Sequence, residues 1–297
     1  MRRDRQDRLD GQDEKTLREF VAAASDRLRD AGISQAANLD ARLLAQHVLG
    51  WDTARFLTNR DQDATTSFLL NYEHYVARRM RREPISYIIG TREFWSLDFE
   101  VTPDVLIPRP ETELVVEEAL DIVKRESRSR FIDVGTGSGV LAIVLAKESP
   151  SARVVATDVS AGALKVARRN AERHGVADRI TFVETSFLDG LEESADLIVS
   201  NPPYVPAVSA PGLTPEVVDY EPSVAVFGGV DGLDGLRHVL KDSVAHLAPD
   251  GWLIVEFGYG QEDSVRSIVD GLPALSLVKI RADLQDIPRT AVMQKHA

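Results

Sequence analysis

The 297-residue sequence contains no cysteine, and this absence removes several classes of chemistry. Disulfide bonds, thiolate metal sites and a cysteine nucleophile are all excluded, and a chain without cysteine fits a reducing cytoplasm. The sequence also lacks an apolar run approaching the ~20 residues that a membrane-spanning helix requires. Its N-terminal segment, MRRDRQDRLDGQDE, has no apolar stretch of the kind found in secretory signals. We therefore expect a cytoplasmic protein, not bound to membranes, in which residues 1–15 form a frayed tail.

Positive charge is scarce in most of the chain. The formal net charge is −12, and residues 1–84 carry 15 basic and 14 acidic side chains, so the remainder has a net charge of −13. A protein that grips nucleic acid usually presents a basic face that displaces phosphate counterions. We therefore expect no direct nucleic-acid binding. We also expect the protein to be a monomer. The dense basic cluster is either a solvated helix end or a docking surface, and it comprises Arg78, Arg79, Arg81 and Arg82.

The spacing of apolar residues changes along the chain and indicates two domains. From residue 16 to residue 84 apolar side chains recur at helical spacing, with Gly32, Gly50 and Pro84 as stop signals. This pattern predicts a small helical domain. Residues 85–108 are rich in β-branched and aromatic side chains, which predicts a linking β-hairpin that includes Tyr87–Gly90. The second domain is expected to occupy residues 109–297.

Residues 109–297 alternate between short apolar runs and amphipathic stretches, which predicts an α/β fold with a doubly wound, mostly parallel sheet. Expected helices cover 114–124, 140–147, 161–174 and 233–247. Five parallel strands are expected at 130–134, 153–157, 180–184, 197–200 and 252–257. Two more, 276–281 and 290–294, should form an antiparallel hairpin at the sheet edge and bring the total to seven. The segment 205–230 has no clear pattern but four prolines, which favours a stiff lid over the neighbouring site.

A glycine-rich turn follows the first expected strand of this sheet. Gly135-Thr136-Gly137-Ser138-Gly139 opens a helix, and Asp133 stands two positions before the first glycine. Glycines let the backbone turn sharply and approach a ligand closely. A dinucleotide fingerprint would need its third glycine one position later. The layout instead resembles that of the class I methyltransferases, which implies S-adenosyl-L-methionine as cofactor and S-adenosyl-L-homocysteine as product, with no metal.

Two further residues at the same sheet edge suit a nucleoside cofactor. Asp158 ends the second strand, and a carboxylate there can accept both ribose hydroxyl protons. Phe187 follows the third strand and can pack on the adenine face. The alternative is that the glycine turn serves only strand–helix packing and that Asp158 caps the next helix.

Asn201-Pro202-Pro203-Tyr204, here called the acceptor loop, follows the fourth expected strand. A planar amide or amino nitrogen is a weak nucleophile because its lone pair is delocalised. The Asn201 side-chain oxygen and the Pro202 carbonyl can accept its two N–H bonds and aim the lone pair at a methyl donor. Consecutive prolines stiffen such a loop, and Tyr204 offers a flat face for stacking. The alternative is an ordinary proline turn at a strand end.

Several motifs together resemble one family, the release factor glutamine methyltransferases (PrmC or HemK family). Besides the glycine turn and the acceptor loop, they are Val105–Glu113 with its Pro-Arg-Pro-Glu-Thr-Glu run, Tyr220-Glu221-Pro222, Gly228-Gly229 and Asp231-Gly232-Leu233. The resemblance covers roughly residues 16–297. It implies methyl transfer to the N5 nitrogen of the glutamine in the Gly-Gly-Gln motif of class I peptide chain release factors, with the helical domain docking that protein.

The resemblance also implies which residues make the site. Gly135, Thr136, Gly137, Ser138, Gly139, Asp158, Phe187 and Asn201 would contact the cofactor. Asn201, Pro202, Pro203 and Tyr204 would hold the glutamine, with Asn201, Pro202 and Tyr204 as catalytic residues. Two alternative activities stay open at this point, because adenine-N6 nucleic-acid methyltransferases share the acceptor tetrapeptide and ribosomal-protein glutamine-N5 methyltransferases resemble this family.

Overall fold

The computed structural model describes residues 15–296, and these divide into two compact units between Ile89 and Gly90. The expected tail at 1–15 lies, apart from Lys15, outside the described residues. Each unit is described by itself below.

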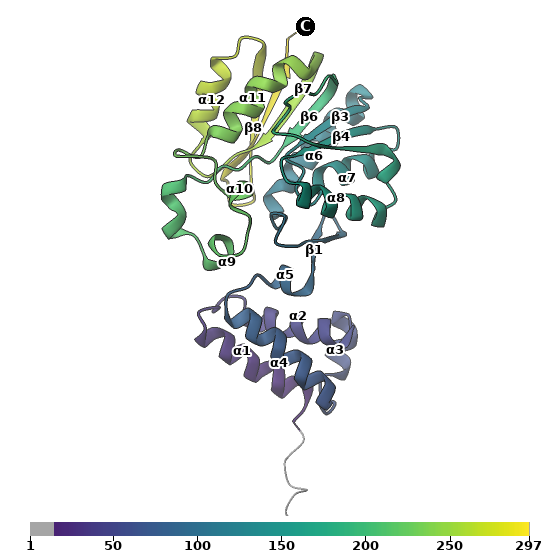
Figure 1. Ribbon diagram of the computed structural model, residues 1–297, viewed down its shortest axis with the longest axis vertical. Coiled ribbons are helices and arrows are strands. Elements are labelled where there is room, and N and C mark those ends of the chain that lie inside the picture. Colours follow the sequence, from purple (N-terminus) through teal and green to yellow (C-terminus); the bar gives the residue numbers. More distant parts are fainter. Residues whose placement is uncertain (1–14, 297) are drawn as a thin grey trace, which may run out of the picture. The chain divides into compact units, whose positions relative to one another are not determined.

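The N-terminal unit is helical (Figure 1). Its helices are α1 (Leu17–Asp30), α2 (Ala37–Leu49), α3 (Thr53–Asn59), α4 (Thr66–Met80) and α5 (Ile85–Ile89). Thr16 and Glu19 form a reciprocal capping box that starts α1, and Gly50, at φ +63°, ends α2. The apolar faces meet in a core that includes Leu28, Leu44 and Val76, all fully buried.

The prediction of a strand at Tyr87–Gly90 is wrong, because α5 occupies most of this stretch. The carbonyl of Pro84 accepts hydrogen bonds from the backbone N–H groups of Tyr87 and Ile88, at 3.0 and 3.1 Å, and so starts a helical turn. Ile88 is buried in the core of the helical unit. Tertiary packing therefore overrides the β propensity of these residues. The hairpin that does form is shorter than 85–108 and consists of β1 (Thr91–Phe94) and β2 (Leu97–Glu100).

The basic cluster at the end of α4 is largely engaged within the unit. Arg79 is buried and pairs with the buried carboxylate of Asp40 at 2.7 Å. Arg78 pairs with Glu83, and Arg82 donates to the carbonyl of Gly32 at 2.7 Å. For Arg79, the expectation of a solvated or docking side chain is therefore wrong. Sequence could not reveal this, because Asp40 lies on a different helix.

The C-terminal unit contains a seven-stranded sheet of order β5-β4-β3-β6-β7-β9-β8. The strands are β3 (Arg130–Val134), β4 (Arg153–Asp158), β5 (Ile180–Glu184), β6 (Ala195–Ser200), β7 (Leu247–Glu256), β8 (Leu275–Ala282) and β9 (Pro288–Lys295). The first five are mutually parallel, whereas β9 is antiparallel to both β7 and β8. The expected mostly parallel sheet with an antiparallel edge hairpin is confirmed.

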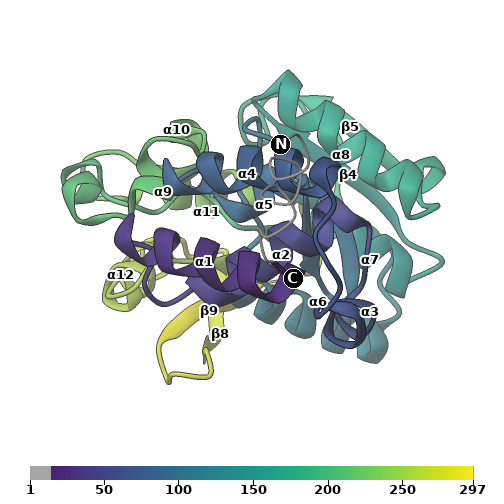
Figure 2. The same ribbon diagram turned by 90° about the horizontal axis from the view of Figure 1, so that it is seen from below.

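Helices cover both faces of this sheet, as Figures 1 and 2 show. One buried cluster joins β3 to α6 (Glu113–Glu126) and α7 (Val140–Glu148), and α8 (Ala161–Arg173) contributes Ala171 to it. The opposite cluster includes residues of α11 (Asp234–His246) and α12 (Glu262–Asp270). Sequence periodicity did not reveal α12, which is only nine residues long. Two 3₁₀ turns, η1 (Pro110–Thr112) and η2 (Ala177–Arg179), precede α6 and β5.

The 205–230 segment is more ordered than its sequence pattern indicates. It contains η3 (Ala207–Gly212), α9 (Pro215–Val218) and α10 (Ser223–Val226). These elements are four to six residues long, too short for apolar periodicity to register.

Candidate methyl-transfer site

The glycine turn between β3 and α7 uses its three glycines in two ways. Gly135, Gly137 and Gly139 have φ values of +72°, +56° and +88°, which L side chains rarely adopt. A Cβ on Gly135 or Gly137 would meet nothing within 4 Å, whereas one on Gly139 would lie 2.8 Å from Ile143 and 3.2 Å from Ala167. Gly135 and Gly137 therefore leave open space beside the backbone, and Gly139 allows α7 to approach α8.

Asp133, the penultimate residue of β3, stabilises the glycine turn through hydrogen bonds. One carboxylate oxygen accepts hydrogen bonds from the Thr136 hydroxyl at 2.6 Å and from the Ala142 backbone N–H at 3.0 Å. The other oxygen, Oδ1, is buried and receives no hydrogen bond. Burial raises the pKa of Asp133 to about 7.

Asp158 ends β4 and ties the glycine turn to the neighbouring strand. Its carboxylate accepts from the backbone N–H of Gly137 and from that of Ser160, each at 2.9 Å. Ser160 is the residue that caps α8, by accepting from Ala163, so Asp158 is not that helix's N-cap. Burial raises the pKa of Asp158.

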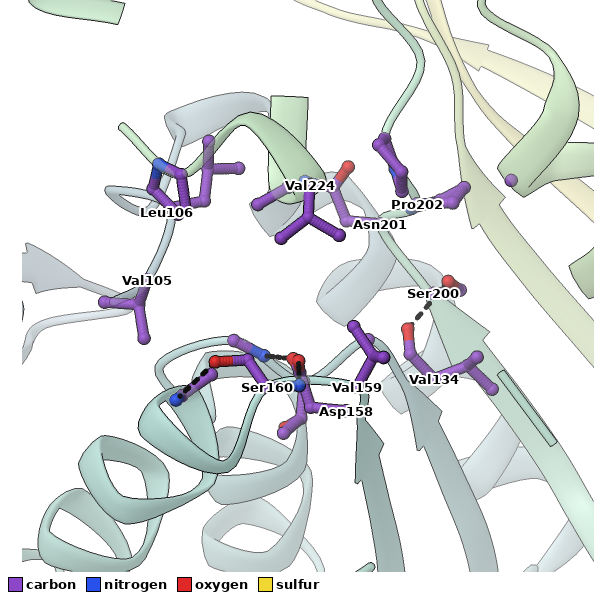
Figure 3. Close-up of a pocket in the computed structure, with 18 of the residues that line it drawn as sticks. Val105, Leu106, Val134, Asp158, Val159, Ser160, Ser200, Asn201, Pro202 and Val224 are labelled. Carbon is purple, nitrogen blue, oxygen red and sulfur yellow. Dashed lines mark hydrogen bonds between the residues drawn. The ribbon is translucent and has the colours of Figure 1, made fainter. Parts of the chain in front are cut away.

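A cavity of about 430 Å³ opens above these carboxyl ends. Figure 3 shows Asp158 and Ser160 on one side of it and Asn201, Pro202 and Val224 on the other. The volume lies in the range of small-molecule sites, ~300–1,000 Å³. Of the site residues that sequence predicts, nine line it: Gly135, Thr136, Gly137, Ser138, Asp158, Phe187, Asn201, Pro202 and Pro203. Gly139 and Tyr204 are not among the lining residues.

Phe187 lines the cavity and stacks on a histidine side chain. Its ring stacks on that of His238, with centroids 4.9 Å apart and planes 3° from parallel. Both residues line the cavity. Sequence reasoning placed His238 on a helix and gave it no role, because its approach to Phe187 depends on how α11 crosses the sheet. Phe187 itself has φ +49° and accepts a hydrogen bond from the Thr157 hydroxyl through its carbonyl.

Asn201 belongs to a buried chain of hydrogen bonds. Its amide nitrogen Nδ2 donates to the Thr112 hydroxyl at 2.9 Å, and that hydroxyl donates to Glu256 Oε2 at 2.6 Å. The Tyr204 hydroxyl donates to the other oxygen of the same carboxylate at 3.0 Å. Burial raises the pKa of Glu256 to about 7, although both hydrogen bonds oppose the shift. Burial also raises the pKa of Tyr204.

Several glycines later in the chain lie against the acceptor loop. A Cβ on Gly228 would lie 2.7 Å from the Gly232 carbonyl oxygen and closer still to that of Pro203. One on Gly235 would lie 3.1 Å from the Pro203 oxygen. A Cβ on Gly232, the glycine of the Asp-Gly-Leu motif, would lie 2.9 Å from the Pro206 backbone nitrogen and closer still to the Tyr204 carbonyl oxygen. The lack of side chains at Gly228 and Gly232 therefore lets the acceptor loop occupy this position, which gives a physical reason for the Gly-Gly and Asp-Gly-Leu motifs.

Gln261 fixes the end of the acceptor loop. Its amide nitrogen donates to the Tyr204 carbonyl at 2.9 Å and its amide oxygen accepts from the Gly258 backbone at 2.8 Å. The site thus recruits Thr112, Glu256 and Gln261, which sequence reasoning missed. Glu256 could have been found, because it ends a strand whose carboxyl end lies at the same sheet edge as Asn201. For Gln261 no local pattern points to a role.

The 205–230 segment forms part of the cavity wall, through Pro222, Val224, Ala225 and Phe227. Arg109, from the motif before α6, pairs with the buried Glu221 of this segment at 2.6 Å. Two motifs that are separate in the sequence therefore meet beside the cavity.

The cavity residues fit S-adenosyl-L-methionine on two observations. The open backbone at Gly135 and Gly137 leaves room for a ligand against the turn. The unpartnered Oδ1 of Asp133 offers a buried acceptor, of the kind that suits a cationic group. Asp158 retains lone pairs for ribose hydroxyls beyond the two backbone donors it already accepts.

Nowhere in 15–296 do three or more His, Cys, Asp or Glu side chains gather as a metal site would require. Within the described part of the chain, no helix combines the length and the apolar character needed to cross a membrane.

Two family models match this sequence. The PrmC N-terminal domain matches residues 7–90, and the methyltransferase small domain matches residues 112–217. Curated relatives carry the name release factor glutamine methyltransferase. The one from Geobacter sulfurreducens is 43% identical over 251 residues, 84% of this chain and 87% of the relative. The one from Bradyrhizobium diazoefficiens is 40% identical over 295 residues, 97% of each chain.

Solved structures share the fold at lower identity. A methyltransferase from Pyrococcus furiosus has a TM-score of 0.50 and 19% identity, and the match covers 76% of this chain and 100% of that one. The hMettl16 catalytic domain, in complex with a 3′UTR hairpin, has a TM-score of 0.56 and 19% identity over 75% of this chain and 81% of that one. Both likenesses concern the fold alone.

Proposed function

Because the chain belongs to the release factor glutamine methyltransferase family, we propose that it methylates the glutamine of the Gly-Gly-Gln motif in class I peptide chain release factors. The methyl group comes from S-adenosyl-L-methionine and goes to the N5 amide nitrogen, leaving N5-methylglutamine and S-adenosyl-L-homocysteine. The observation that carries this proposal is the position of Asn201, whose amide lies at the cavity wall with its nitrogen already bonded to Thr112.

The acceptor loop supplies the chemistry through positioning. Asn201 Oδ1 and the Pro202 carbonyl accept the two N–H bonds of the glutamine amide, so its lone pair points toward the donor. The donor brings a methyl group on a positively charged sulfur; the new N–C bond forms as the C–S bond breaks, and the nitrogen then loses one proton to water. Since holding two reactants in line replaces a bimolecular encounter, most of the rate enhancement comes from geometry. Tyr204 does not line the cavity; its hydroxyl bonds to Glu256, so its role here is to fix the end of the acceptor loop and not to stack on the glutamine.

The cofactor lies along the glycine turn in this proposal. Residues 135–138 face its methionine portion, Asp158 accepts from the ribose hydroxyls, and Phe187 packs on the adenine. Gly139, which does not line the cavity, is left out of this contact. Asn201 borders both the cofactor and the glutamine. The stacked pair of Phe187 and His238 supports an adenine site, because it places aromatic rings at the cavity edge.

The helical unit, residues 16–84 of the sequence with α5 added, is proposed to dock the protein substrate. The family model that matches this unit is named for this family, whereas the one that matches residues 112–217 is named only for a methyltransferase small domain. Arg79 is buried in an ion pair, so the docking role falls to exposed side chains of the unit. We place the reaction in the cytoplasm, with a monomer as the working enzyme and no metal.

Incubation with labelled donor, followed by mass spectrometry of the acceptor, tests the proposal. Equal amounts of release factor, ribosomal protein and DNA are supplied in separate reactions. We expect a mass increase of one CH₂ group on the Gly-Gly-Gln peptide of the release factor, and no increase when that glutamine is replaced by alanine. Label confined to DNA would support an adenine-N6 methyltransferase instead, and label confined to the ribosomal protein would support the sister glutamine activity.

A further inference from the structure

Glu256 lies directly beside the acceptor loop but outside the cavity. It ends β7, and the register pairs Ser200 of β6 with Val255 of β7, so Glu256 is level with Asn201. The side chain is fully buried, at 0% exposure, and does not line the cavity. Its influence on the acceptor loop therefore passes through the residues to which it is hydrogen-bonded.

The hydrogen bonds at Glu256 run in one direction: Thr112 and Tyr204 each donate to one oxygen of its carboxylate. In its ionised form, which prevails above the raised pKa of about 7, this carboxylate can only accept. A hydroxyl has one proton, and that of Thr112 is committed to Glu256. The Thr112 oxygen can then only accept from Asn201, which places the amide nitrogen, and not the amide oxygen, on the Thr112 side.

This direction decides what Asn201 presents to a substrate. With Nδ2 held by Thr112, Oδ1 takes the opposite side of the planar amide. No group among residues 15–296 donates to Oδ1. A flipped amide would instead present N–H to the N–H of an incoming glutamine, and two donors cannot bond to each other.

We propose that Glu256 is a positioning residue that, through Thr112, sets the orientation of the Asn201 amide so that its oxygen faces the acceptor nitrogen. The inference rests on the proposed glutamine methylation for its functional meaning. The same carboxylate also holds Tyr204, so one buried group anchors both ends of the acceptor loop.

Paired substitutions at Thr112 isolate the hydroxyl. Thr112→Val keeps the shape of the side chain but removes the bridge, whereas Thr112→Ser keeps the bridge and removes a methyl group. We expect Thr112→Val to lower kcat roughly 10- to 100-fold, as misplaced catalytic groups do. The KM for release factor and the dissociation constant for S-adenosyl-L-methionine should change far less, and Thr112→Ser should restore most of kcat. Wild-type kcat in a folded Thr112→Val variant would overturn the proposal.

A second pair isolates the carboxylate. Glu256→Leu removes both acceptors, which frees the Thr112 proton to bond Asn201 Oδ1 and flip the amide. Glu256→Gln can still turn its amide oxygen to Thr112 and its NH₂ group to Tyr204, so it should retain much more activity than Glu256→Leu. Equal kcat in the two variants would contradict the relay.

The Asn201 side-chain NH₂ signal gives a readout without any acceptor. In ¹⁵N-labelled protein, identified by its loss in Asn201→Ala, one of its two protons should exchange slowly because Thr112 holds it. That protection should vanish in Thr112→Val and Glu256→Leu and persist in Thr112→Ser. If wild-type enzyme methylates no release factor while this protection pattern holds, the proposed function fails and the positioning role stands. If the protection is unchanged in Glu256→Leu, the positioning role fails whatever the substrate.

Discussion

The acceptor loop depends on the absence of a side chain at Gly228, and Gly228→Ala measures that dependence. An added Cβ would lie 2.7 Å from the Gly232 oxygen, whereas ordinary contact begins at 3.4 Å, so the surrounding backbone must move by at least about 0.7 Å. The Pro203 carbonyl is closer still and lies inside the acceptor loop. The φ angle of Gly228 is not in the left-handed region, so alanine adds contact without backbone strain.

A shift of this size acts on catalysis more than on donor binding. Misplacement of reacting groups by about 1 Å costs on the order of 10²-fold in rate, equivalent to about 3 kcal/mol of activation free energy. We expect Gly228→Ala to lower the single-turnover rate of methyl transfer to release factor by about this factor. The dissociation constant for S-adenosyl-L-methionine, measured by calorimetry, should stay within about threefold, since the glycine turn and Asp158 lie on other strands.

Two further glycines provide a graded control. A Cβ on Gly212, in the same segment, would meet nothing within 4 Å, so Gly212→Ala should behave as wild type. A Cβ on Gly235 would lie 3.1 Å from the Pro203 oxygen, so the transfer rate of Gly235→Ala should lie between those of Gly212→Ala and Gly228→Ala. A Gly228→Ala variant that folds and transfers methyl at the wild-type rate would refute the reasoning, as would a loss of rate in Gly212→Ala.

Three other predictions concern the carboxylates and the helical unit. Asp158→Ala should weaken donor binding about 10- to 100-fold in calorimetry, the loss typical of charged hydrogen bonds; an unchanged dissociation constant would remove Asp158 from the donor site. Arg79→Ala should reduce the free energy of unfolding of the helical unit by about 3–5 kcal/mol in urea, because the buried Asp40 carboxylate loses its ion pair with Arg79, and a change below about 1 kcal/mol would contradict that. Because the pKa of Glu256 is raised in the folded protein, its contribution to the free energy of unfolding is fully present below its ordinary pKa near 4.5. That contribution is lost as pH rises through about 7. The stability of Glu256→Gln relative to wild type should therefore increase between pH 4.5 and 8, by on the order of 3 kcal/mol; a pH-independent difference would show that the pKa is not raised.

Sequence predicted the sheet well because each strand is a short apolar run bounded by turn signals. Phe131 to Val134 and Leu197 to Ser200 are buried along their whole length, and such runs are typical of parallel sheets. Tyr87–Ile89 is equally β-branched and aromatic but forms a helix, because Pro84 starts a turn there and Ile88 packs into the helical core. Local composition cannot distinguish these two outcomes.

The candidate site likewise contains some residues that the sequence reveals and others that it does not. The glycine turn, Asp158 at a strand end and the proline-stiffened loop can be recognised in the sequence, and Glu256, which also ends a strand, could have been. Thr112 could not, because its role comes from a hydrogen bond to Glu256, 144 positions away. The role of Gly228 likewise depends on a carbonyl that the fold brings to it. The sequence does not show which groups these residues contact, and only the folded structure does.

The central claim is that Asn201 holds the acceptor nitrogen in line with the donor, and the single-turnover transfer rate of Asn201→Ala tests it most directly. The account predicts a loss of at least about 10²-fold in transfer to release factor, the scale found when a positioned hydrogen-bonding group is removed from a catalytic site, while donor binding remains measurable by calorimetry. A folded Asn201→Ala enzyme that transfers methyl at the wild-type rate would contradict it.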